Sequence, residues 1–446
     1  MGVTEELASF LVEARYDSIP PDVINRAKVL VLDFVGGALA GCQTDVGDKI
    51  TEYVTEKKGK PEASIIGKSI QISAPYAAYV NGVFNHAPEL EAVSQKTSPN
   101  PLAAIAASLS VGEKERASGK DLLEGFVLGF EIQARVGGAS LAGVSRKGRI
   151  SIFNHLGAVG SACRIMGLDA YQSRMAIGIA AFQAGGLITN VGTMAHILEL
   201  PVAARDGIEA AEFAKLGVTS HPDIIEAPQG FCDALIEEGG YNLDEMLMNL
   251  GDKYQITDPG ISIKKYPCCY RSHCALDALF QIMAERDISY SDIEKVSVDI
   301  NLYDSLLMKF QEPKTGEEAR FSYSHILGTA ILKGEVWLDS FTDASVSQQS
   351  FCDARKKVEV NVHPEWAKDR AQARTPVTVK VKNGGSFEKE VAVPREPTEK
   401  QLLDRYRKAA GGVLTLDQTE RSIEKLLVLE EVDEISELMR LLKKEV

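Results

Sequence analysis

The sequence predicts a mainly α-helical protein with an inserted α+β domain. Three observations support this fold class: helical patterns fill the first 262 residues, strand-like alternation begins after residue 263, and helical patterns return after residue 397. Three amphipathic C-terminal helices could hardly bury their apolar faces alone, so we expect them to pack on the N-terminal helices. The predicted organisation is a discontinuous helical domain, residues 1–262 and 397–446, interrupted by an α+β lid domain at residues 263–396.

The N-terminal helices follow from apolar spacing and from helix-end signals. Apolar residues within 7–14 recur at the spacing of one helix face, and those within 23–39 cover more than one face, which predicts a buried central helix. The segment 118–121 predicts the start of another long helix. Patterns rich in Gly and Ala at 155–166 and 175–188 predict helices whose backbones approach closely.

The middle of the chain changes to strand-like alternation. Three runs have the period of half-buried strands: residues 296–300, 358–362 and 377–381. Asn383-Gly384 joins the last run to residues 387–393, which predicts a hairpin because Asn-Gly readily supplies two positive φ values. Helical patterns at 274–285 and 323–332 alternate with these strands, so this part is expected to be α+β.

Composition and charge argue against several classes of function. The 446 residues include 63 Asp and Glu against 49 Lys and Arg, a net charge of −14, and no basic run appears. Nucleic-acid binding is therefore disfavoured, because phosphate backbones require a stripe of Lys and Arg. No apolar stretch reaches the roughly 18 residues of a membrane-spanning helix, and the acidic N-terminus does not resemble a signal peptide. Seven Cys without a CxxC pair predict reduced thiols in a cytoplasmic protein.

Most standard catalytic signatures are missing from the sequence. It has no P-loop, no HExxH, no GxSxG elbow and no dinucleotide-binding fingerprint. The seven His stand at no metal-ligand spacing, and although distant ligands can converge in a fold, nothing in the sequence argues for a metal. We therefore predict neither a metal nor a cofactor.

Two unusual segments carry His residues beside other polar groups. Residues 81–91, punctuated by Gly and Pro, carry His86 with Glu89 and Glu91, and a solvated helix end is an equally good interpretation. His196 enters an Ala-rich helix, where a lone His more often packs or caps than reacts.

A third segment, Lys264 to His273, has a stronger functional interpretation. It carries Tyr266-Pro267-Cys268-Cys269 and then Arg271, before a helix that we expect to begin at about Ser272. A helix N-terminus presents N–H groups and positive potential, which favour bound anions. The same potential favours the neutral form of a His in the first turn, and this form can accept a proton.

These segments resemble motifs of the MmgE/PrpD family, which contains 2-methylcitrate dehydratase, cis-aconitate decarboxylase and iminodisuccinate epimerase. Tyr266-Pro267-Cys268-Cys269 with His273 resembles the family's YPCC-xxx-H motif. Further similar segments cover nearly the whole chain: residues 81–86, 118–123, 192–194, 203–207, 226–231 and 318–322. The resemblance implies a helical domain interrupted by an α+β lid, and a homodimer.

Several positions of the family's active site carry a different residue here. The acidic DxDD cluster is reduced to Glu89 and Glu91, and the segment 97–101 lacks the His of the family's HPS motif. Ser151, close to Arg149, stands where the family has the His of its GFHPT motif.

The later motifs depart from the family as well. His196 replaces an active-site Lys, Glu199 replaces a later His of the same motif, and His325 replaces a Tyr. Of the family's active-site positions, only His273 and Lys264 are clearly kept.

The resemblance and these residues imply a cofactor-independent lyase that acts by acid–base chemistry α to a carboxylate of a small di- or tricarboxylic acid, such as a 2-methylcitrate-like substrate. Dehydration and decarboxylation both pass through a carbanion-like species, which positioned bases and cationic side chains handle. His273 is the predicted base, with His196 as the opposing acid or second base. The predicted catalytic residues are His273, His196, Glu91 and Ser151. The predicted substrate-binding residues are Lys264, Arg271, Arg149, His86, Glu89 and His325.

Two alternatives stay open at the level of sequence. A Lys at position 196 would be a standing cation, whereas His is mostly neutral near pH 7 and exchanges protons. An epimerase or isomerase of a dicarboxylate that uses two His therefore also fits. With so many positions replaced, a non-catalytic homologue that binds a carboxylate metabolite, or a structural partner of an active paralogue, fits as well.

Overall fold

The structure is a computed structural model that describes residues 2–94, 100–140, 148–366 and 374–445. The chain divides into two compact units: unit 1 comprises Met1–Thr189, His196–Ile263 and Thr398–Val446, and unit 2 comprises Asn190–Ala195 and Lys264–Pro397. The structure is 58% helical and 8% strand. This composition, with the larger sheet in unit 2, confirms the predicted class of a mainly α fold with a smaller α+β part.

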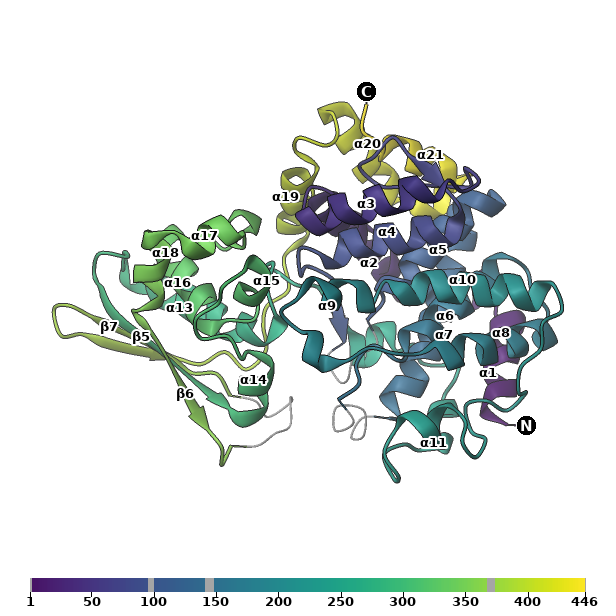
Figure 1. Cartoon of the computed structure of the whole chain (residues 1–446), viewed down its shortest axis with the longest axis horizontal. Helices are drawn as coiled ribbons and strands as arrows, with labels where there is room; N and C mark the ends of the chain where they lie inside the picture. The colour runs from purple at the N-terminus through teal and green to yellow at the C-terminus, as the bar shows by residue number, and fades with distance from the viewer. Residues whose placement is uncertain (1, 95–99, 141–147, 367–373, 446) are drawn as a thin grey trace. The chain divides into compact units, whose positions relative to one another are not determined.

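Helices build unit 1 (Figure 1). Those before residue 140 are α1 (Val3–Glu13), α2 (Pro21–Gly41), α3 (Asp45–Lys57), α4 (Ala74–His86), α5 (Leu102–Glu115) and α6 (Gly119–Gly138). Those that follow are α7 (Asn154–Ile165), α8 (Ala170–Gln183), α9 (Met194–Glu199, which enters unit 1 at His196), α10 (Val202–Lys215), α11 (Phe231–Leu235) and α12 (Leu243–Leu247). The core lies where α5, α6, α7 and α10 pack on one another, with α2 and α4 beside them.

Local sequence explains where the long helices begin and end. At the start of α6 the Ser118 hydroxyl accepts from the Asp121 N–H at 3.2 Å, and the Asp121 carboxylate accepts from the Ser118 N–H at 2.9 Å. This capping box confirms the predicted helix start. The predicted helix 175–188 is too long, because α8 ends at Gln183 and Gly186 (φ 125°) then turns the chain so that its carbonyl accepts from Ile150.

Two short antiparallel pairs of strands complete unit 1. β1 (Ala63–Ser64) pairs with β2 (Gln71–Ile72), and β3 (Val93–Ser94) pairs with β4 (Ile261–Ser262). The second pair joins the segment after α4 to the end of the N-terminal part of unit 1. It therefore restrains the chain that carries Glu89 and Glu91.

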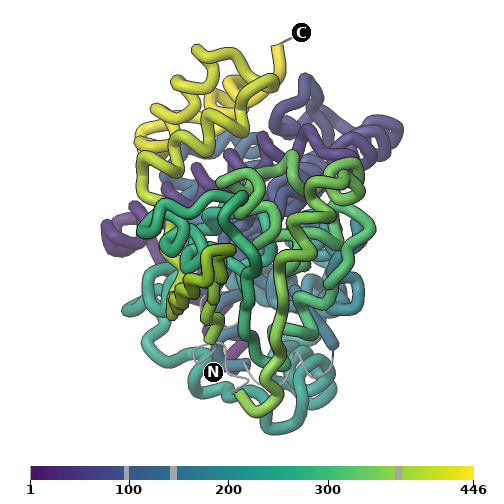
Figure 2. Tube along the Cα trace, turned by 90° about the vertical axis from the view of Figure 1, so that its left-hand side faces the viewer, coloured from purple at the N-terminus to yellow at the C-terminus, as the bar shows by residue number. Residues whose placement is uncertain are grey.

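The C-terminal helices pack on the N-terminal ones within unit 1 (Figures 1 and 2). α19 (Glu399–Ala410) and α20 (Leu416–Leu427) contact α2, and α21 (Ile435–Leu441) contacts α5. Arg405 of α19 forms an ion pair with the buried Asp33 of α2. The pair stabilises the contact between the two ends of the chain, because removing either partner would leave a buried charge uncompensated.

Unit 2 is an α+β unit with one four-stranded sheet. Its helices are α13 (His273–Arg286), α14 (Leu302–Leu307), α15 (Gly316–Ala319), α16 (Tyr323–Lys333), α17 (Asp343–Ser347) and α18 (Gln349–Arg355). Its strands are β5 (Ile293–Asn301), β6 (Val358–His363), β7 (Val377–Val381) and β8 (Ser386–Lys389), in the order β6-β5-β7-β8. β5 is parallel to β6 and antiparallel to β7, and the helices α13 and α16 contact the sheet.

The predicted hairpin forms between β7 and β8, but its turn differs from the expectation. Gly384 has a positive φ of 89°, whereas Asn383 is not among the residues with positive φ. The loop consists of the three residues 382–384, because Val381 donates to the Gly385 carbonyl and Gly384 donates to the Val381 carbonyl, each at 2.9 Å. A loop of this length needs only one left-handed residue, so the expected pair of positive φ values is wrong.

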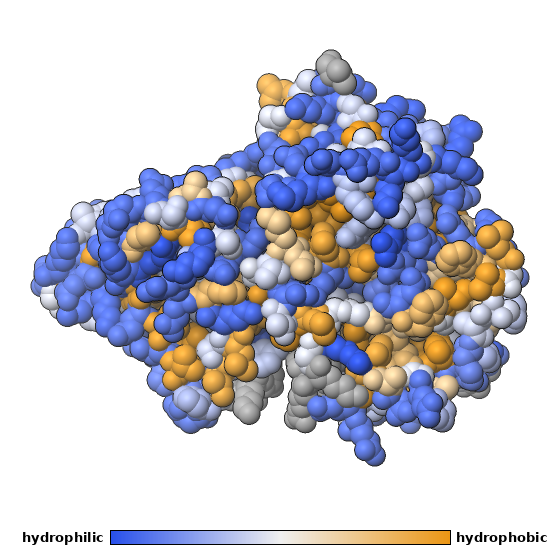
Figure 3. All heavy atoms as spheres, viewed as in Figure 1, coloured by the Kyte–Doolittle hydropathy of each residue, from blue (hydrophilic) through white to orange (hydrophobic). Residues whose placement is uncertain are grey.

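No helix among the described residues is long and apolar enough to cross a membrane. Figure 3 shows a face of the molecule that is mostly hydrophilic, with apolar residues gathered over α8 and α10. Exposed apolar side chains of these two helices are Tyr171, Phe182 and Phe213.

The packing of the C-terminal segment on α6 predicts the effect of a glycine substitution. A Cβ at Gly119 would overlap the Leu429 carbonyl oxygen, and backbone at this position cannot easily move because Gly119 also donates to the Val432 carbonyl at 2.8 Å. We expect Gly119→Ala to lower the free energy of unfolding by about 1–3 kcal/mol, measured by urea denaturation.

Gly112→Ala is the matched control, because Gly112 is also a helical glycine that faces the C-terminal segment. Its Cβ would lie 3.4 Å from Ile435 Cγ1, an ordinary van der Waals contact. Alanine favours the helix, so we expect a change between zero and a gain of about 1 kcal/mol. Equal losses in the two variants would contradict the described packing.

Candidate functional site

The predicted site residues fall into two groups, one in each unit. Unit 1 contains His86, Glu89, Glu91, Arg149, Ser151 and His196. Unit 2 contains Lys264, Arg271, His273 and His325. Residues 97–99, part of the segment 97–101 that lacks the His of the family's HPS motif, lie outside the described residues.

In unit 1, His86, Glu89 and His196 come together in the interior. One potential ligand atom of each residue lies within 4.8 Å of the corresponding atoms of the other two. His86 Nε2 is 3.9 Å from Glu89 Oε2, and the rings of His86 and His196 meet edge to face with centroids 5.0 Å apart. The exposed fractions of the three residues are 1%, 7% and 9%. The interpretation of residues 81–91 as a solvated helix end is therefore wrong.

Small residues and turns produce this cluster. Gly82 allows α4 to approach the start of α10, because a Cβ there would lie 2.9 Å from Pro201 Cβ. This approach places the connection from α9 to α10 beside the last turn of α4, which ends at His86. Glu89 then reverses the chain: it has a φ of 56°, and its N–H donates to the His86 carbonyl at 2.9 Å.

Each imidazole of the cluster is oriented by a second contact. His86 Nδ1 lies 3.0 Å from the Ile197 carbonyl oxygen, which can only accept, so Nδ1 carries the proton. His196 Nδ1 lies 3.4 Å from Glu199 Oε2, and Glu199 Oε1 accepts from the Leu187 N–H at 2.9 Å. Glu199 therefore fixes the His196 ring and is itself fixed by backbone.

The segment with Arg149 and Ser151 lies against the strand-like stretch that holds Glu199. Arg149 pairs with Leu187 in an isolated antiparallel bridge, and Leu187 is the residue that donates to Glu199. Ser151 follows with a φ of 68° and is 9% exposed. The Arg149 guanidinium donates to the Ala234 carbonyl at 3.1 Å. Glu91, two residues beyond Glu89, is buried.

In unit 2, the Tyr266–Cys269 turn is held by a distant segment. Arg320 donates to the Pro267 carbonyl at 3.0 Å, and the Cys269 N–H donates to the Arg320 carbonyl at 3.0 Å. The Tyr323 hydroxyl donates to the Arg271 carbonyl at 2.9 Å. Residues 318–322, one of the segments that resemble the family, and the adjacent Tyr323 therefore hold the turn before α13 in place.

His273 is the first residue of α13, one position after the predicted start. It is 1% exposed, and the rings of Tyr266 and Tyr270 each lie 5.1 Å from its own ring. His273 Nε2 is 3.3 Å from the Cys268 carbonyl oxygen, so the neutral ring carries its proton on Nε2. Nδ1 is then the nitrogen that can accept a proton. Burial and the adjacent Asp277 raise the pKa of Tyr266, which therefore stays protonated.

The two predicted cationic residues of unit 2 differ in their surroundings. Lys264 is buried, with an exposed fraction of 1%. Arg271 forms an ion pair with the buried Asp304 at 3.1 Å, and its guanidinium lies over the Tyr303 ring at 5.0 Å. A substrate carboxylate at Arg271 would therefore compete with Asp304 for the guanidinium.

Comparison with known proteins assigns both units to one family. Residues 5–244 match the MmgE/PrpD N-terminal domain, and residues 266–431 match the MmgE/PrpD C-terminal domain. The chain belongs to the MmgE/PrpD family. The second match begins at Tyr266, the first residue of the segment that resembles the family's YPCC motif.

Known MmgE/PrpD relatives are similar over more than nine-tenths of their length. The chain is 25% identical to the cis-aconitate decarboxylase of Mus musculus over 462 residues, which cover 99% of this chain and 93% of the relative. It is also 25% identical to the cis-aconitate decarboxylases of Homo sapiens and Aspergillus terreus, with 99% of this chain and 95% and 96% of the relatives covered.

The geometry of this MmgE/PrpD protein argues against a substrate-binding role for His325. The side chain is fully buried: its Nε2 lies 2.8 Å from the Ser340 carbonyl oxygen, and its Nδ1 lies 3.1 Å from the Arg355 guanidinium. Its ring stacks on Phe351 with centroids 5.5 Å apart. Both nitrogens are engaged within unit 2, so His325 is a packing residue, which the sequence pattern did not indicate.

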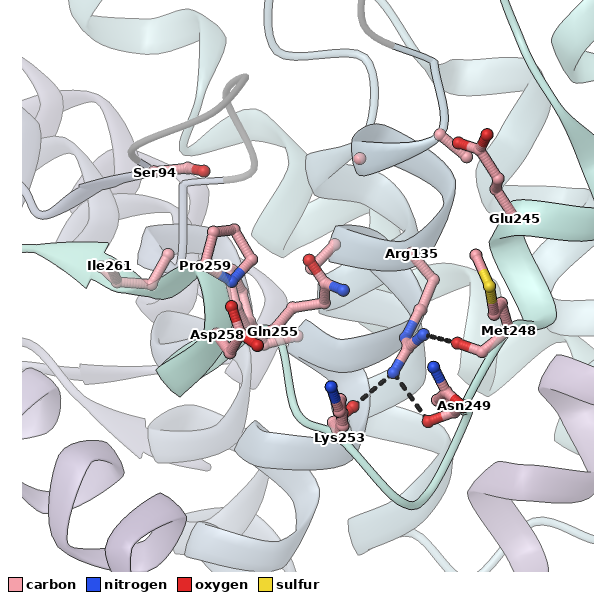
Figure 4. Close-up of a pocket in the computed structure, with 14 residues that line it drawn as sticks. Ser94, Arg135, Glu245, Met248, Asn249, Lys253, Gln255, Asp258, Pro259 and Ile261 are labelled. Carbon is pink, nitrogen blue, oxygen red and sulfur yellow. Dashed lines mark hydrogen bonds between the residues drawn. The ribbon is translucent and has the colours of Figure 1, made fainter. Parts of the chain in front are cut away.

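Sequence reasoning also missed a pocket in unit 1 (Figure 4). The pocket has a volume of about 350 Å³ and includes Arg135, Lys253 and Asp258 among its lining residues, but none of the predicted site residues. Arg135 donates to the carbonyls of Met248, Asn249 and Lys253, as the dashed lines show, and to Glu131 at 2.6 Å. Its donors therefore hold the pocket wall together, which makes Arg135 a structural residue.

Burial of His325 predicts a specific pH dependence of stability. Burial lowers the pKa of His325 to about 4, below the ordinary value of 6.5. The unfolded chain therefore binds a proton that the folded chain excludes, and this contribution to stability is lost as pH falls from 6.5 towards 4. Between pH 7 and pH 5 we expect the free energy of unfolding to fall by about 2 kcal/mol more in the wild type than in His325→Gln, by urea denaturation.

His363→Gln is the control for this experiment. The hydrogen bond to Asp299 raises the pKa of the His363 imidazole, so its contribution is present at low pH and lost as pH rises. Its removal cannot reduce the loss of stability on acidification. Equal pH slopes for the wild type and His325→Gln would contradict the assignment.

Proposed function

We propose that this MmgE/PrpD protein is a lyase that acts next to a carboxylate of a small di- or tricarboxylic acid. The observation that carries the proposal is the full-length similarity to cis-aconitate decarboxylases, over 99% of this chain. The buried His273 at the start of a helix supports it further, because a neutral imidazole in this position can accept and return a proton. cis-Aconitate is the first substrate to test, and a 2-methylcitrate-like acid is the second.

The chemistry requires proton transfer and stabilisation of negative charge. Loss of CO₂ from an unsaturated tricarboxylate leaves an electron pair on carbon, which must take up a proton. Dehydration instead removes a proton α to a carboxylate and expels the hydroxyl group as water after it is protonated. We assign the proton on carbon to His273, through Nδ1, and the stabilisation of carboxylate charge to the buried Lys264.

His196 is proposed as a second proton-transfer residue. Its Nδ1 lies 3.4 Å from a Glu199 carboxylate oxygen, so Glu199 can hold the ring in one orientation for proton transfer. This pair also supports the second candidate function, epimerisation or isomerisation, in which protons are exchanged without loss of water or CO₂. The products separate the two candidates.

Substitution of His273 tests the proposed base. We expect His273→Ala, and His273→Gln with its retained donor group, to lower kcat by about 10²–10⁴-fold, because proton transfer by a positioned side chain contributes that much. Turnover of cis-aconitate and 2-methylcitrate is followed by NMR in D₂O, which reports CO₂ loss, water loss and deuterium exchange together.

The exposed His221 offers a matched control, since it accepts from the Asp223 N–H at 3.2 Å and is not one of the predicted site residues. His221→Ala should retain wild-type turnover. Near wild-type activity in both His273 variants would remove the assignment of the base. Saturable binding of the acids by the wild type without turnover or exchange would instead favour the non-catalytic alternative.

The homodimer implied by the family resemblance is part of the same proposal. Light scattering coupled to size exclusion should give twice the 48.4 kDa mass of one chain. A mass of a single chain across the working concentration range would contradict it.

A further inference from the structure

The cluster of His86, Glu89 and His196 in unit 1 has the composition of a transition-metal site. Two imidazole nitrogens and one carboxylate oxygen are the ligands that bind Zn²⁺ and Fe²⁺ in sites that keep a position open for water or another ligand. The chosen ligand atoms lie within 4.8 Å of one another, and His86 Nε2 and Glu89 Oε2 are 3.9 Å apart. Around an ion with bonds of about 2.1 Å, the ligand atoms would be roughly 3.0–3.5 Å apart. Each ligand atom would therefore have to move by about 1 Å, which a small side-chain rotation allows.

The contacts behind the two imidazoles are those of metal ligands. A ligating His almost always donates its other nitrogen to a carbonyl or carboxylate, which fixes the tautomer and the ring. His86 Nδ1 donates to the Ile197 carbonyl, and His196 Nδ1 faces the Glu199 carboxylate. Nε2 of each ring is therefore the nitrogen directed to the ion, and for His86 this atom faces Glu89.

Backbone structure and burial support the same interpretation. Glu89 adopts a φ of 56°, a left-handed conformation that is unfavourable for a residue with a Cβ, and this turn directs its carboxylate back to His86. Glu89 and the two imidazoles are buried, so an ion bound among them would lie away from bulk water.

Other His–carboxylate groups in the described chain lack these features. His155 faces Asp206 at 3.3 Å, but no third potential ligand accompanies this pair, because His86, Glu89 and His196 are the one such group of three among the described residues. His363 has a carboxylate at each ring nitrogen, Asp299 at 2.7 Å and Glu365 at 3.2 Å, so neither nitrogen is directed at a shared centre.

We propose that His86, Glu89 and His196 bind one divalent transition-metal ion, with Glu199 as the positioning residue of His196. The sequence argued for no metal because two of these ligands are more than 100 residues apart in the chain. The open positions of the ion would take water or an oxygen of an anionic ligand. With an ion bound through Nε2, His196 would be a ligand and not the second proton-transfer residue proposed above, whereas His273 and Lys264 would keep their proposed roles. Metal binding itself is measured without turnover.

Direct titration of the full chain tests the site. After dialysis against a chelator, Co²⁺ is added and the visible absorption of protein-bound Co²⁺ is recorded, with Zn²⁺ as a competitor and equilibrium dialysis for the stoichiometry. We expect one ion per chain with micromolar or tighter affinity, displacement by Zn²⁺, and no displacement by Mg²⁺, which prefers oxygen ligands.

Variants separate this site from other cation binding. Glu89→Gln, which keeps the shape of the side chain, and His196→Ala should abolish the one-to-one Co²⁺ complex. Glu199→Gln should weaken it by about 10–100-fold, because it removes only the group that orients His196. His363→Ala, at the other His with two carboxylates, should leave the affinity unchanged.

Far-UV circular dichroism of the metal-free variants checks that each is folded. Should His196→Ala not fold, Glu89→Gln and Glu199→Gln decide the outcome. Millimolar binding, a Glu89→Gln variant with wild-type affinity, or equal losses in His363→Ala would each overturn the metal site. A wild type that binds Co²⁺ tightly but shows no turnover would leave the metal site in place and remove only the proposed lyase function.

Discussion

The close approach of α6 and α7 is the constraint on which much of unit 1 depends. A side chain at Gly129, Gly157 or Gly160 would overlap the facing helix, and the backbones can approach only because these positions carry none. The position of α7 determines where the preceding chain, with Arg149 and Ser151, enters the core. That chain pairs with Leu187, whose N–H holds Glu199, and Glu199 orients His196. A packing requirement between two helices is thus transmitted through backbone hydrogen bonds to one side chain of the candidate site.

The two groups of candidate residues differ in the charge of the ligand that they are suited to hold. In unit 1, two His and a carboxylate share the interior with Glu199 close by, so the cluster is suited to holding a cation or a mobile proton. In unit 2, His273 stands at a helix N-terminus with Lys264 and Arg271 in the same segment, which is suited to holding an anion. An acidic chain with a net charge of −14 can therefore handle anionic acids only through local positive charge of this kind.

Sequence patterns were reliable where short-range physics decides the structure. Ser118 with Asp121 marks the start of α6, the alternation in residues 296–300 forms the centre of β5, and the chain after Pro267 enters α13 at His273. They were less reliable where a partner distant in sequence decides. The predicted helix 175–188 ends early because Gly186 pairs with Ile150, and His325 was read as a binding residue because its contacts with Ser340 and Arg355 have no local signature.

The sequence by itself determined the fold class, the family and the identity of the unusual segments, because helix caps, apolar periods and motifs are local in the chain. It also pointed to His86, Glu89 and His196, one by one. Only the tertiary structure decided that these three residues meet, because the end of α4 lies beside α9 only if Pro201 packs directly on Gly82. Their burial, their tautomers and the role of Glu199 arise from contacts across the fold. A site formed by residues that are distant in the chain therefore has no signature in the sequence pattern, and only the packing of the helices brings it together.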